Sequence, residues 1–387
     1  MPDSLIHSSS DNGPGLHALV IGVGAYPHLI GGSGTLFAGH EGMAQLTSAP
    51  VSATTFAEWL LRPDGYHHPH VPLRSVRLLL SKKNEEGAAE AGFRHPATDA
   101  VHTVPPATLH EVEQAVEAWV AELNTAEENR GLFFFSGHGV SAGLEQWLLL
   151  SDFGVAGRNP YEPAIRFSGF HFGMGSVAAR EQLYFLDACR SHSDEAAATF
   201  GNAGTPLVGP NPRARFDRER QPPVFNATLK GADAFGRRGK PSFFTEALLE
   251  ALKGGGSDDS DDDGRWKVET NTLNRVVQWL IGRTARRERL SLAQINSGFE
   301  MSSLYFSYLQ EPPLTPVGVA CDPDDATASA VFAAGEDVRW CAADRDPLLP
   351  LGEHRFTAEF ADGSFRRGER PRDVRPPYRE VRIPVEP

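Results

Sequence analysis

The chain has 387 residues, of which 40% are hydrophobic and 22% are charged, so it can bury a core and form one large domain plus a smaller one. Its net charge of −13, without a dominant basic tract, argues against nucleic acid or an anionic membrane as the main partner. It has no apolar run of about 18 residues and no signal-peptide pattern, and its sparse cysteines suit a reducing compartment, so we expect a cytoplasmic protein.

The first part of the chain alternates between strand and helix patterns. Residues 1–15 are polar and are expected to form a disordered tail. The β-branched run from His17 to Tyr26 predicts a buried parallel strand. Further along, the patterns predict a glycine-rich loop at 31–42, a helix at 51–62, a strand at 75–81 and a long loop at 82–106.

The next elements complete this alternation. Thr108 and Glu111 form a capping box, which predicts a helix that extends to about Asn124. Three apolar runs then predict strands at 131–136, 146–153 and 182–187. Strands that alternate with helices indicate an α/β fold, in which helices flank a mostly parallel sheet.

The second half of the chain begins with a long stretch of low hydrophobicity at 190–222, and loops of this length inside a domain are usually functional or disordered. It is followed by a predicted strand at 224–230, helices at 242–252 and 272–289, an acidic glycine-rich linker at 254–264 and a strand at 303–309 that would close the sheet. These elements complete a domain predicted over 16–311. Short runs without helical periodicity predict a small all-β, sandwich-like module over 314–387.

Two of the predicted strands end at a reactive side chain. One runs into Ser136-Gly137-His138-Gly139, and the other runs into Asp187-Ala188-Cys189. Because neighbouring parallel strands present their carboxyl ends at the same edge of a sheet, we expect His138 to lie beside Cys189. A thiol needs an adjacent base to become a nucleophile, so the pair predicts a catalytic dyad. The backbone amides of Gly139 and Cys189 could hold the oxyanion of a tetrahedral intermediate.

These segments resemble the caspase-like cysteine peptidases, the clan that holds caspases, metacaspases and paracaspases. The caspase signature is Gln-Ala-Cys-x-Gly with a histidine about 50 residues upstream. The chain has Asp187-Ala188-Cys189-Arg190-Ser191 with His138 at that spacing. The resemblance covers about residues 16–310. It implies a caspase–hemoglobinase-type fold, a thiol protease that forms an acyl-enzyme, protein substrates and no cofactor.

The resemblance also bears on specificity. In metacaspase-like and paracaspase-like members, an acid two residues before the cysteine lies in the S1 pocket and favours a basic P1 residue. Asp187 occupies this position, and Ser136 corresponds to a serine that lines the pocket. Where a second pocket acid would stand, the chain has Ser52. The resemblance therefore implies cleavage after Arg or Lys, since a carboxylate makes charge-assisted contacts with such side chains.

Activation by cleavage is a further implication of the resemblance, because the segment after the cysteine is often cut in this architecture. The protein would then be a zymogen, matured by itself or by an upstream protease. Bacterial members of the clan often act in antiviral defence or programmed cell death, and the residue usage of this chain is typical of bacteria. The candidate processing sites are Arg213, Arg215, Arg218 and Arg220.

Two other functions stay open at this stage. A non-catalytic member would use the fold as a scaffold, and an Asp-specific caspase-type protease would need a basic S1 pocket, which Asp187 opposes. Two segments could suggest a metal. His67-His68-Pro69-His70 reads better as a turn, and Asp259–Gly264 reads better as a solvated linker because Thr270 stands where a calcium loop needs glutamate. We therefore predict no metal site.

Overall fold

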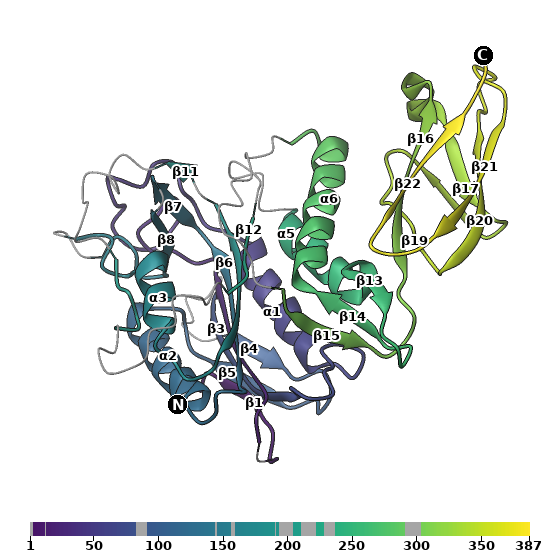
Figure 1. Ribbon diagram of the computed structural model, residues 1–387. Helices are drawn as coiled ribbons and strands as arrows, with labels where there is room; N and C mark the ends of the chain where they lie inside the picture. The colour runs from purple at the N-terminus through teal and green to yellow at the C-terminus, as the bar shows by residue number, and fades with distance from the viewer. Residues whose placement is uncertain are drawn as a thin grey trace. The chain divides into compact units, whose positions relative to one another are not determined.

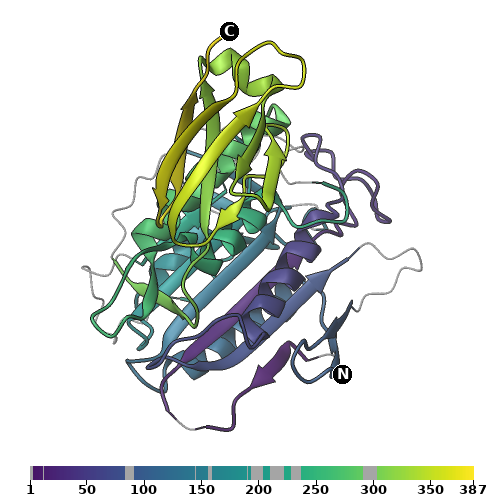
Figure 2. The same ribbon diagram turned by 90° about the vertical axis from the view of Figure 1, so that its right-hand side faces the viewer.

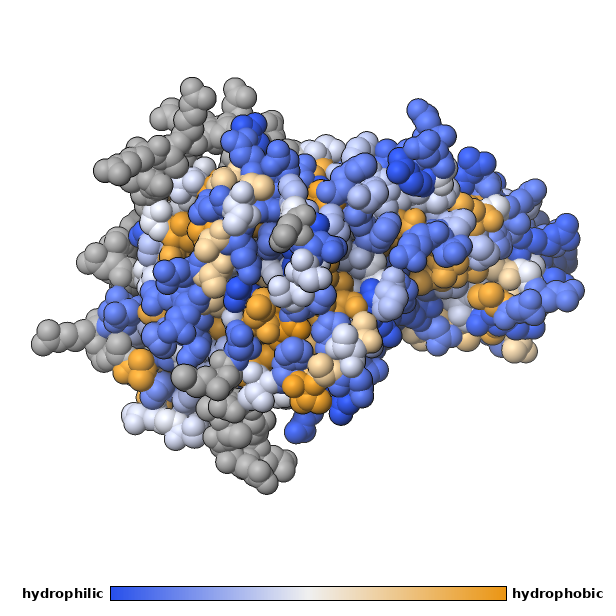
Figure 3. All heavy atoms as spheres, turned by 90° about the horizontal axis from the view of Figure 1, so that it is seen from below, coloured by the Kyte–Doolittle hydropathy of each residue, from blue (hydrophilic) through white to orange (hydrophobic). Residues whose placement is uncertain are grey.

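The computed structural model describes residues 3–11, 13–82, 91–143, 145–155, 159–189, 191–192, 204–209, 222–227, 237–290 and 303–387. These residues divide into two compact units, one that holds the described residues up to Glu246 and one that begins at Ala247. None of the described helices combines the length and the apolar character that a membrane span requires. The face drawn in Figure 3 is mainly hydrophilic, with apolar side chains between the polar ones.

The first unit is built on a six-stranded sheet (Figure 1). Its strands lie in the order β1 (Leu5–Ser8), β3 (Leu73–Ser81), β2 (Leu16–Val23), β6 (Arg130–Gly137), β10 (Glu181–Ala188) and β12 (Val224–Asn226). All neighbours are parallel except β1, which runs antiparallel to β3 at the edge. The predicted α/β class with a mostly parallel sheet is confirmed.

Helices cover both faces of this sheet (Figure 1). They are α1 (Ser48–Leu61) on one face, and α2 (Leu109–Leu123) and α3 (Phe167–Met174) on the other. Successive side chains of β6 alternate between the two faces, as the pleat of a strand requires. Phe134 stacks on Phe56 of α1 with 4.4 Å between ring centroids, whereas Phe133 lies 5.0 Å from Phe170 of α3. Burial on both sides explains why the middle of this strand, Leu132–Phe135, is continuously apolar.

A second, smaller sheet begins where the central strands end. Its strands are arranged as β11 (Ser191–His192), β7 (Gly139–Ala142), β8 (Glu145–Leu149) and β9 (Ala164–Arg166). β7 follows β6 after a single residue, and β11 follows β10 after two. His138 is therefore held from both sides by regular backbone pairing, and Cys189 directly follows β10.

Two predictions for the first unit are wrong. The tail expected at 1–15 contains β1, which is held by its pairing with β3 and by the buried side chain of Ile6. The loop expected at 82–106 contains an antiparallel hairpin of β4 (Ala91–Arg94) and β5 (Val101–Val104). The strands β1, β4 and β5 have four residues each, so their own sequences are too short to predict them without the partner strand.

The second unit begins within a helix. The helix α5 (Phe243–Glu250) crosses from the first unit and continues as a π-helical turn at Ala251–Gly255. A three-stranded antiparallel sheet and a long helix follow it: β13 (Ser257–Ser260), β14 (Trp266–Glu269), β15 (Tyr305–Leu309) and α6 (Thr270–Glu288). The predicted linker at 254–264 is therefore partly helix and strand, and the strand at 303–309 joins β14 rather than the main sheet.

The C-terminal residues form the small all-β module, whose strands are coloured light green to yellow in Figure 2. Phe332, Phe356 and Ile383 belong to one hydrophobic core that both of its sheets share. One sheet is ordered β19 (Leu348–Leu349), β16 (Thr315–Asp322), β22 (Arg379–Pro384). The other is ordered β18 (Val338–Cys341), β17 (Val331–Ala334), β20 (Gly352–Glu359), β21 (Gly368–Val374).

Candidate active site

The ends of β6 and β10 bring the predicted reactive residues together. The two strands pair in parallel register, with Asp187 opposite Ser136 and Ala188 opposite Gly137. The next residues along these strands are His138 and Cys189. A Cβ atom added to Gly139 would lie 2.5 Å from the Cys189 carbonyl oxygen, so only glycine permits this backbone approach.

The imidazole of His138 is buried and oriented by a backbone carbonyl. Its Nε2 atom lies 2.6 Å from the carbonyl oxygen of Ala44. Because a carbonyl oxygen can only accept, Nε2 donates this bond, and Nδ1 is the ring nitrogen that can take a proton. Burial lowers the pKa of His138 to about 4, although the bond to Ala44 raises it in part. The ring is therefore neutral at neutral pH, as a general base requires.

Tyr26 supports the same histidine from the segment that follows β2. Its hydroxyl accepts a 2.8 Å hydrogen bond from the backbone N–H of His138 and donates a 3.2 Å bond to the carbonyl of Leu149. The two rings lie 4.9 Å apart between centroids. Burial raises the pKa of Tyr26, so it remains a neutral phenol that can make both bonds. The sequence indicated only a strand at Tyr26 and no role for Ala44.

A buried acid lies next to the predicted dyad, within a cluster of hydroxyl groups. Asp187 is 2% exposed, and its Oδ2 atom accepts hydrogen bonds from Ser136 (2.8 Å), Ser242 (2.6 Å) and Thr245 (2.9 Å). The Ser52 hydroxyl also lowers the pKa of this carboxyl group. The structure thus brings together the three predicted S1 residues and adds Ser242 and Thr245, which sequence reasoning missed.

The two additional hydroxyls come from the start of α5. The Ser242 hydroxyl accepts a 2.9 Å bond from the Thr245 N–H, which is an N-terminal helix cap. The Ser242 N–H donates in turn to the Ser52 hydroxyl of α1 at 2.8 Å. A helix N-terminus favours negative charge, so this placement suits a carboxylate at Asp187. A Ser-x-x-Thr pattern at the start of the helix is the sequence signal for this cap, and nothing in it indicates the acid.

Burial and the hydroxyl cluster act in opposite directions on the pKa of Asp187. Burial raises the pKa of this carboxyl group, and the hydrogen bonds from the serine and threonine hydroxyls lower it in part. Among the described residues, no arginine, lysine or histidine forms an ion pair with Asp187. Within the described part of the chain, the hydrogen bonds to this acid come from neutral donors.

Removing one donor from this cluster is expected to destabilise the fold. Thr245→Val keeps the shape of a buried side chain but deletes one hydrogen bond to Asp187, so the free energy of unfolding should fall by about 1–3 kcal/mol. Urea unfolding measures this loss. Thr54→Val is the control, because the Thr54 hydroxyl donates to the Pro50 carbonyl within its own helix. Equal stability of the two variants would contradict a role for the cluster.

Other predicted sites have different outcomes. Arg213, Arg215, Arg218 and Arg220 lie outside the described residues. In the histidine-rich segment, the His68 Nδ1 atom accepts the backbone N–H groups of His70 and Val71, as in a turn. Among the described residues, no group of three or more His, Cys, Asp or Glu side chains could hold a metal ion.

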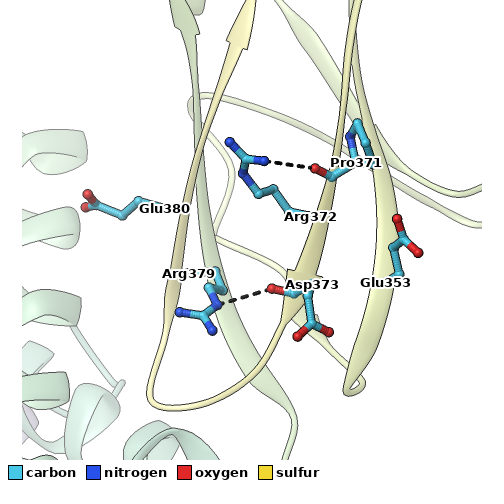
Figure 4. A pocket seen from close by; sticks show the side chains of 6 residues that line it. All are labelled: Glu353, Pro371, Arg372, Asp373, Arg379 and Glu380. Atoms are coloured by element: carbon cyan, nitrogen blue, oxygen red, sulfur yellow. Dashed lines mark hydrogen bonds between the residues drawn. The ribbon is translucent and has the colours of Figure 1, made fainter.

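A separate pocket of about 620 Å³ lies in the C-terminal module (Figure 4). Two of its arginines bond to backbone carbonyls, Arg379 to Asp373 and Arg372 to Pro371. Most of its side chains are exposed and both signs of charge are present, so it lacks the buried nucleophile and base of the strand-end site. The pocket is lined by Glu353, Pro371, Arg372, Asp373, Arg379 and Glu380.

Comparison with known proteins agrees with this arrangement. The family model of the caspase domain matches residues 16–281. A probable protease from a Desulfuromonadales bacterium is 27% identical over 265 residues, which cover 65% of this chain and 29% of that protein. An uncharacterised protein from Sinorhizobium fredii is 26% identical over 191 residues, which cover 49% of this chain and 52% of that protein. The chain thus spans about half or less of the relatives that it matches.

The matched segment contains the five parallel strands of the main sheet, from β2 to β12, together with both strand ends that carry His138 and Cys189. A caspase domain implies a function like that of a cysteine protease, and one relative bears the name of a probable protease. The chain belongs to the caspase-domain family.

Proposed function

We propose that the protein is a cysteine endopeptidase in which Cys189 is the nucleophile and His138 is the general base. The register of β6 and β10 carries this proposal, because it brings the residues after Gly137 and Ala188 to adjacent positions. The bond from His138 Nε2 to Ala44 supports it, since it reserves Nδ1 for proton transfer.

In the proposed mechanism, Nδ1 of His138 takes the thiol proton as Cys189 Sγ bonds to the scissile carbonyl carbon. The backbone amides of Gly139 and Cys189 stabilise the oxyanion that develops. His138 then protonates the leaving amine, the C–N bond breaks, and an acyl-enzyme remains. A water molecule, deprotonated by His138, attacks the thioester, and the second product leaves as a carboxylic acid while Cys189 recovers its proton.

The proposed P1 specificity is for arginine or lysine. Its support is the buried Asp187, which neutral hydroxyls surround and which no described cation neutralises. A guanidinium or ammonium group that reached this carboxylate would make a charge-assisted hydrogen bond in a site of low dielectric constant. Ser136 and Ser52 would line the same pocket. A P1 profile with fluorogenic peptides ending in Arg, Lys or Asp, run beside Cys189→Ala, tests the proposal.

Proteolytic activation belongs to the same proposal. We expect active wild-type protein to be cut within 190–222, after one of Arg213, Arg215, Arg218 or Arg220, because a protease that prefers arginine can cleave such a segment. Intact-mass analysis during incubation would detect the two fragments. Cys189→Ala should stay uncut alone and be cut when mixed with wild type. Full activity of an uncut wild-type chain would contradict this step.

The biological setting that we propose is bacterial defence or programmed cell death, with protein substrates. Its support is the family resemblance and the bacterial source of the relatives.

A further inference from the structure

The side chain of Gln45 clamps the backbone beside the predicted catalytic histidine. Its Oε1 atom accepts the Tyr26 N–H at 2.8 Å, and its Nε2 atom donates to the carbonyls of Tyr26 at 2.9 Å and Ile30 at 3.1 Å. An amide has two donor hydrogens and one acceptor oxygen, and each of these groups is used. Gln45 follows Ala44, whose carbonyl oxygen bonds to His138.

These bonds close the loop between Ile30 and Ala44, whose middle residues are mainly exposed. Ile30 and Ala44 form an isolated bridge, and the Ile30 N–H donates to the Met43 carbonyl at 3.1 Å. On the other side of Gln45, the Leu46 N–H donates to the Gly24 carbonyl at 2.9 Å. The Ala44 carbonyl is therefore placed by the tied ends of the loop, and Gln45 supplies three of the bonds that tie them.

Tyr26 links the same clamp to the histidine. Gln45 holds both backbone polar groups of Tyr26, while the Tyr26 hydroxyl receives the backbone N–H of His138. Two contacts orient His138: the Ala44 carbonyl at its Nε2 atom, and Tyr26 at its backbone and ring. The Gln45 side chain fixes the residues that make both contacts.

We infer that Gln45 and Tyr26 are positioning residues that hold the Ala44 carbonyl and His138 so that the imidazole keeps its proton on Nε2 and uses Nδ1 as the base. This inference rests on the proposed function, in which His138 is the base. A merely structural role would require only that the loop stay folded. A positioning role requires in addition that the tautomer and the rate depend on Gln45.

Gln45→Glu is the sharpest test, because it keeps the size and the acceptor but replaces the two donated bonds by repulsion between a carboxylate and two carbonyl oxygens. We expect kcat toward a fluorogenic Arg peptide to fall by on the order of 10- to 100-fold, with KM within about twofold, since the base is misplaced while the groups that bind the substrate stay in position. Nitrogen-15 NMR of the histidine ring should show the Nε2–H tautomer losing population.

Three further variants separate positioning from folding. Tyr26→Phe removes only the hydroxyl and should also lower kcat, whereas Ser33→Ala, on the same loop, should match wild type. Gln45→Leu tests the clamp without adding charge, and thermal unfolding checks that each variant is folded. A folded Gln45→Glu protein with the wild-type kcat and tautomer would overturn the inference. If wild type cleaves no peptide, the proposed function fails, but the NMR comparison still decides whether Gln45 sets the tautomer.

Discussion

Replacing Cys189 with alanine is expected to abolish peptide cleavage, and His138→Asn is expected to lower kcat by on the order of 10⁴-fold or more. Alanine has no thiol that could attack the scissile carbonyl carbon. Asparagine at position 138 cannot take the proton of the Cys189 thiol. Because burial lowers the pKa of His138 to about 4, the neutral base persists to mildly acidic pH. We therefore expect kcat/KM to fall as the pH drops through about 4, where His138 becomes protonated.

Matched controls make this result specific. Cys341→Ala removes an exposed thiol of the C-terminal module and should keep full activity. His110→Asn removes an exposed histidine of α2 whose side chain bonds to Gln114, and it should also keep full activity. Iodoacetamide labelling of wild type, followed by peptide mapping, should block activity in step with modification of Cys189. Turnover by a folded Cys189→Ala protein would show that another group is the nucleophile.

The second large effect is expected at Asp187. Asp187→Asn removes the negative charge that would pair with a basic P1 side chain, so kcat/KM for an Arg peptide should fall by on the order of a hundredfold or more. The rate for a peptide with a neutral P1 residue should change far less. Since burial raises the pKa of Asp187, the wild-type preference for Arg should also weaken as the pH falls and the carboxyl group gains a proton.

The measurement is the kcat/KM for the Arg peptide divided by that for the peptide with a neutral P1 residue. A ratio is needed because Asp187→Asn also disturbs three hydroxyl donors and is expected to lower stability. Asp152→Asn is the control. Its carboxylate accepts the Leu109 N–H at the start of α2, so its loss affects a helix and not the P1 ratio. An unchanged ratio in folded Asp187→Asn, or a wild-type preference for Asp at P1, would refute the pocket assignment.

The fold was largely predictable where hydrophobic patterns are long and strong. The runs that end at His138 and Cys189 are buried on both faces of the sheet, so their apolar character is continuous and easy to recognise. The short strands β1, β4 and β5 were missed, because a short polar segment becomes a strand only when a partner satisfies its backbone hydrogen bonds. For the same reason, the pairing of β15 with β14 could not be read from either segment alone.

The residues of the candidate site show the same contrast between strong local patterns and contacts that depend on distant partners. His138 and Cys189 stand at the ends of strong strands and were predicted from the chain itself, because parallel pairing dictates that these ends meet. The roles predicted for Ser136 and Asp187 came from the family resemblance. Ser242 and Thr245 were missed, since the pattern before α5 indicates a cap but not what the hydroxyls face. The assignment of Ser52 came from a family position and not from any local signal.

Local sequence patterns were thus sufficient for the α/β class, the family and the two reactive strand ends, because strand burial and parallel pairing follow from hydrophobicity and topology. Which nitrogen of His138 can act as the base depends on the Ala44 carbonyl, a backbone atom that no residue type encodes. The environment of Asp187 depends on hydroxyls contributed by β6, α1 and the start of α5. Hydrogen bonds between distant segments have no sequence period, and only the folded chain brings these groups to the acid and the base.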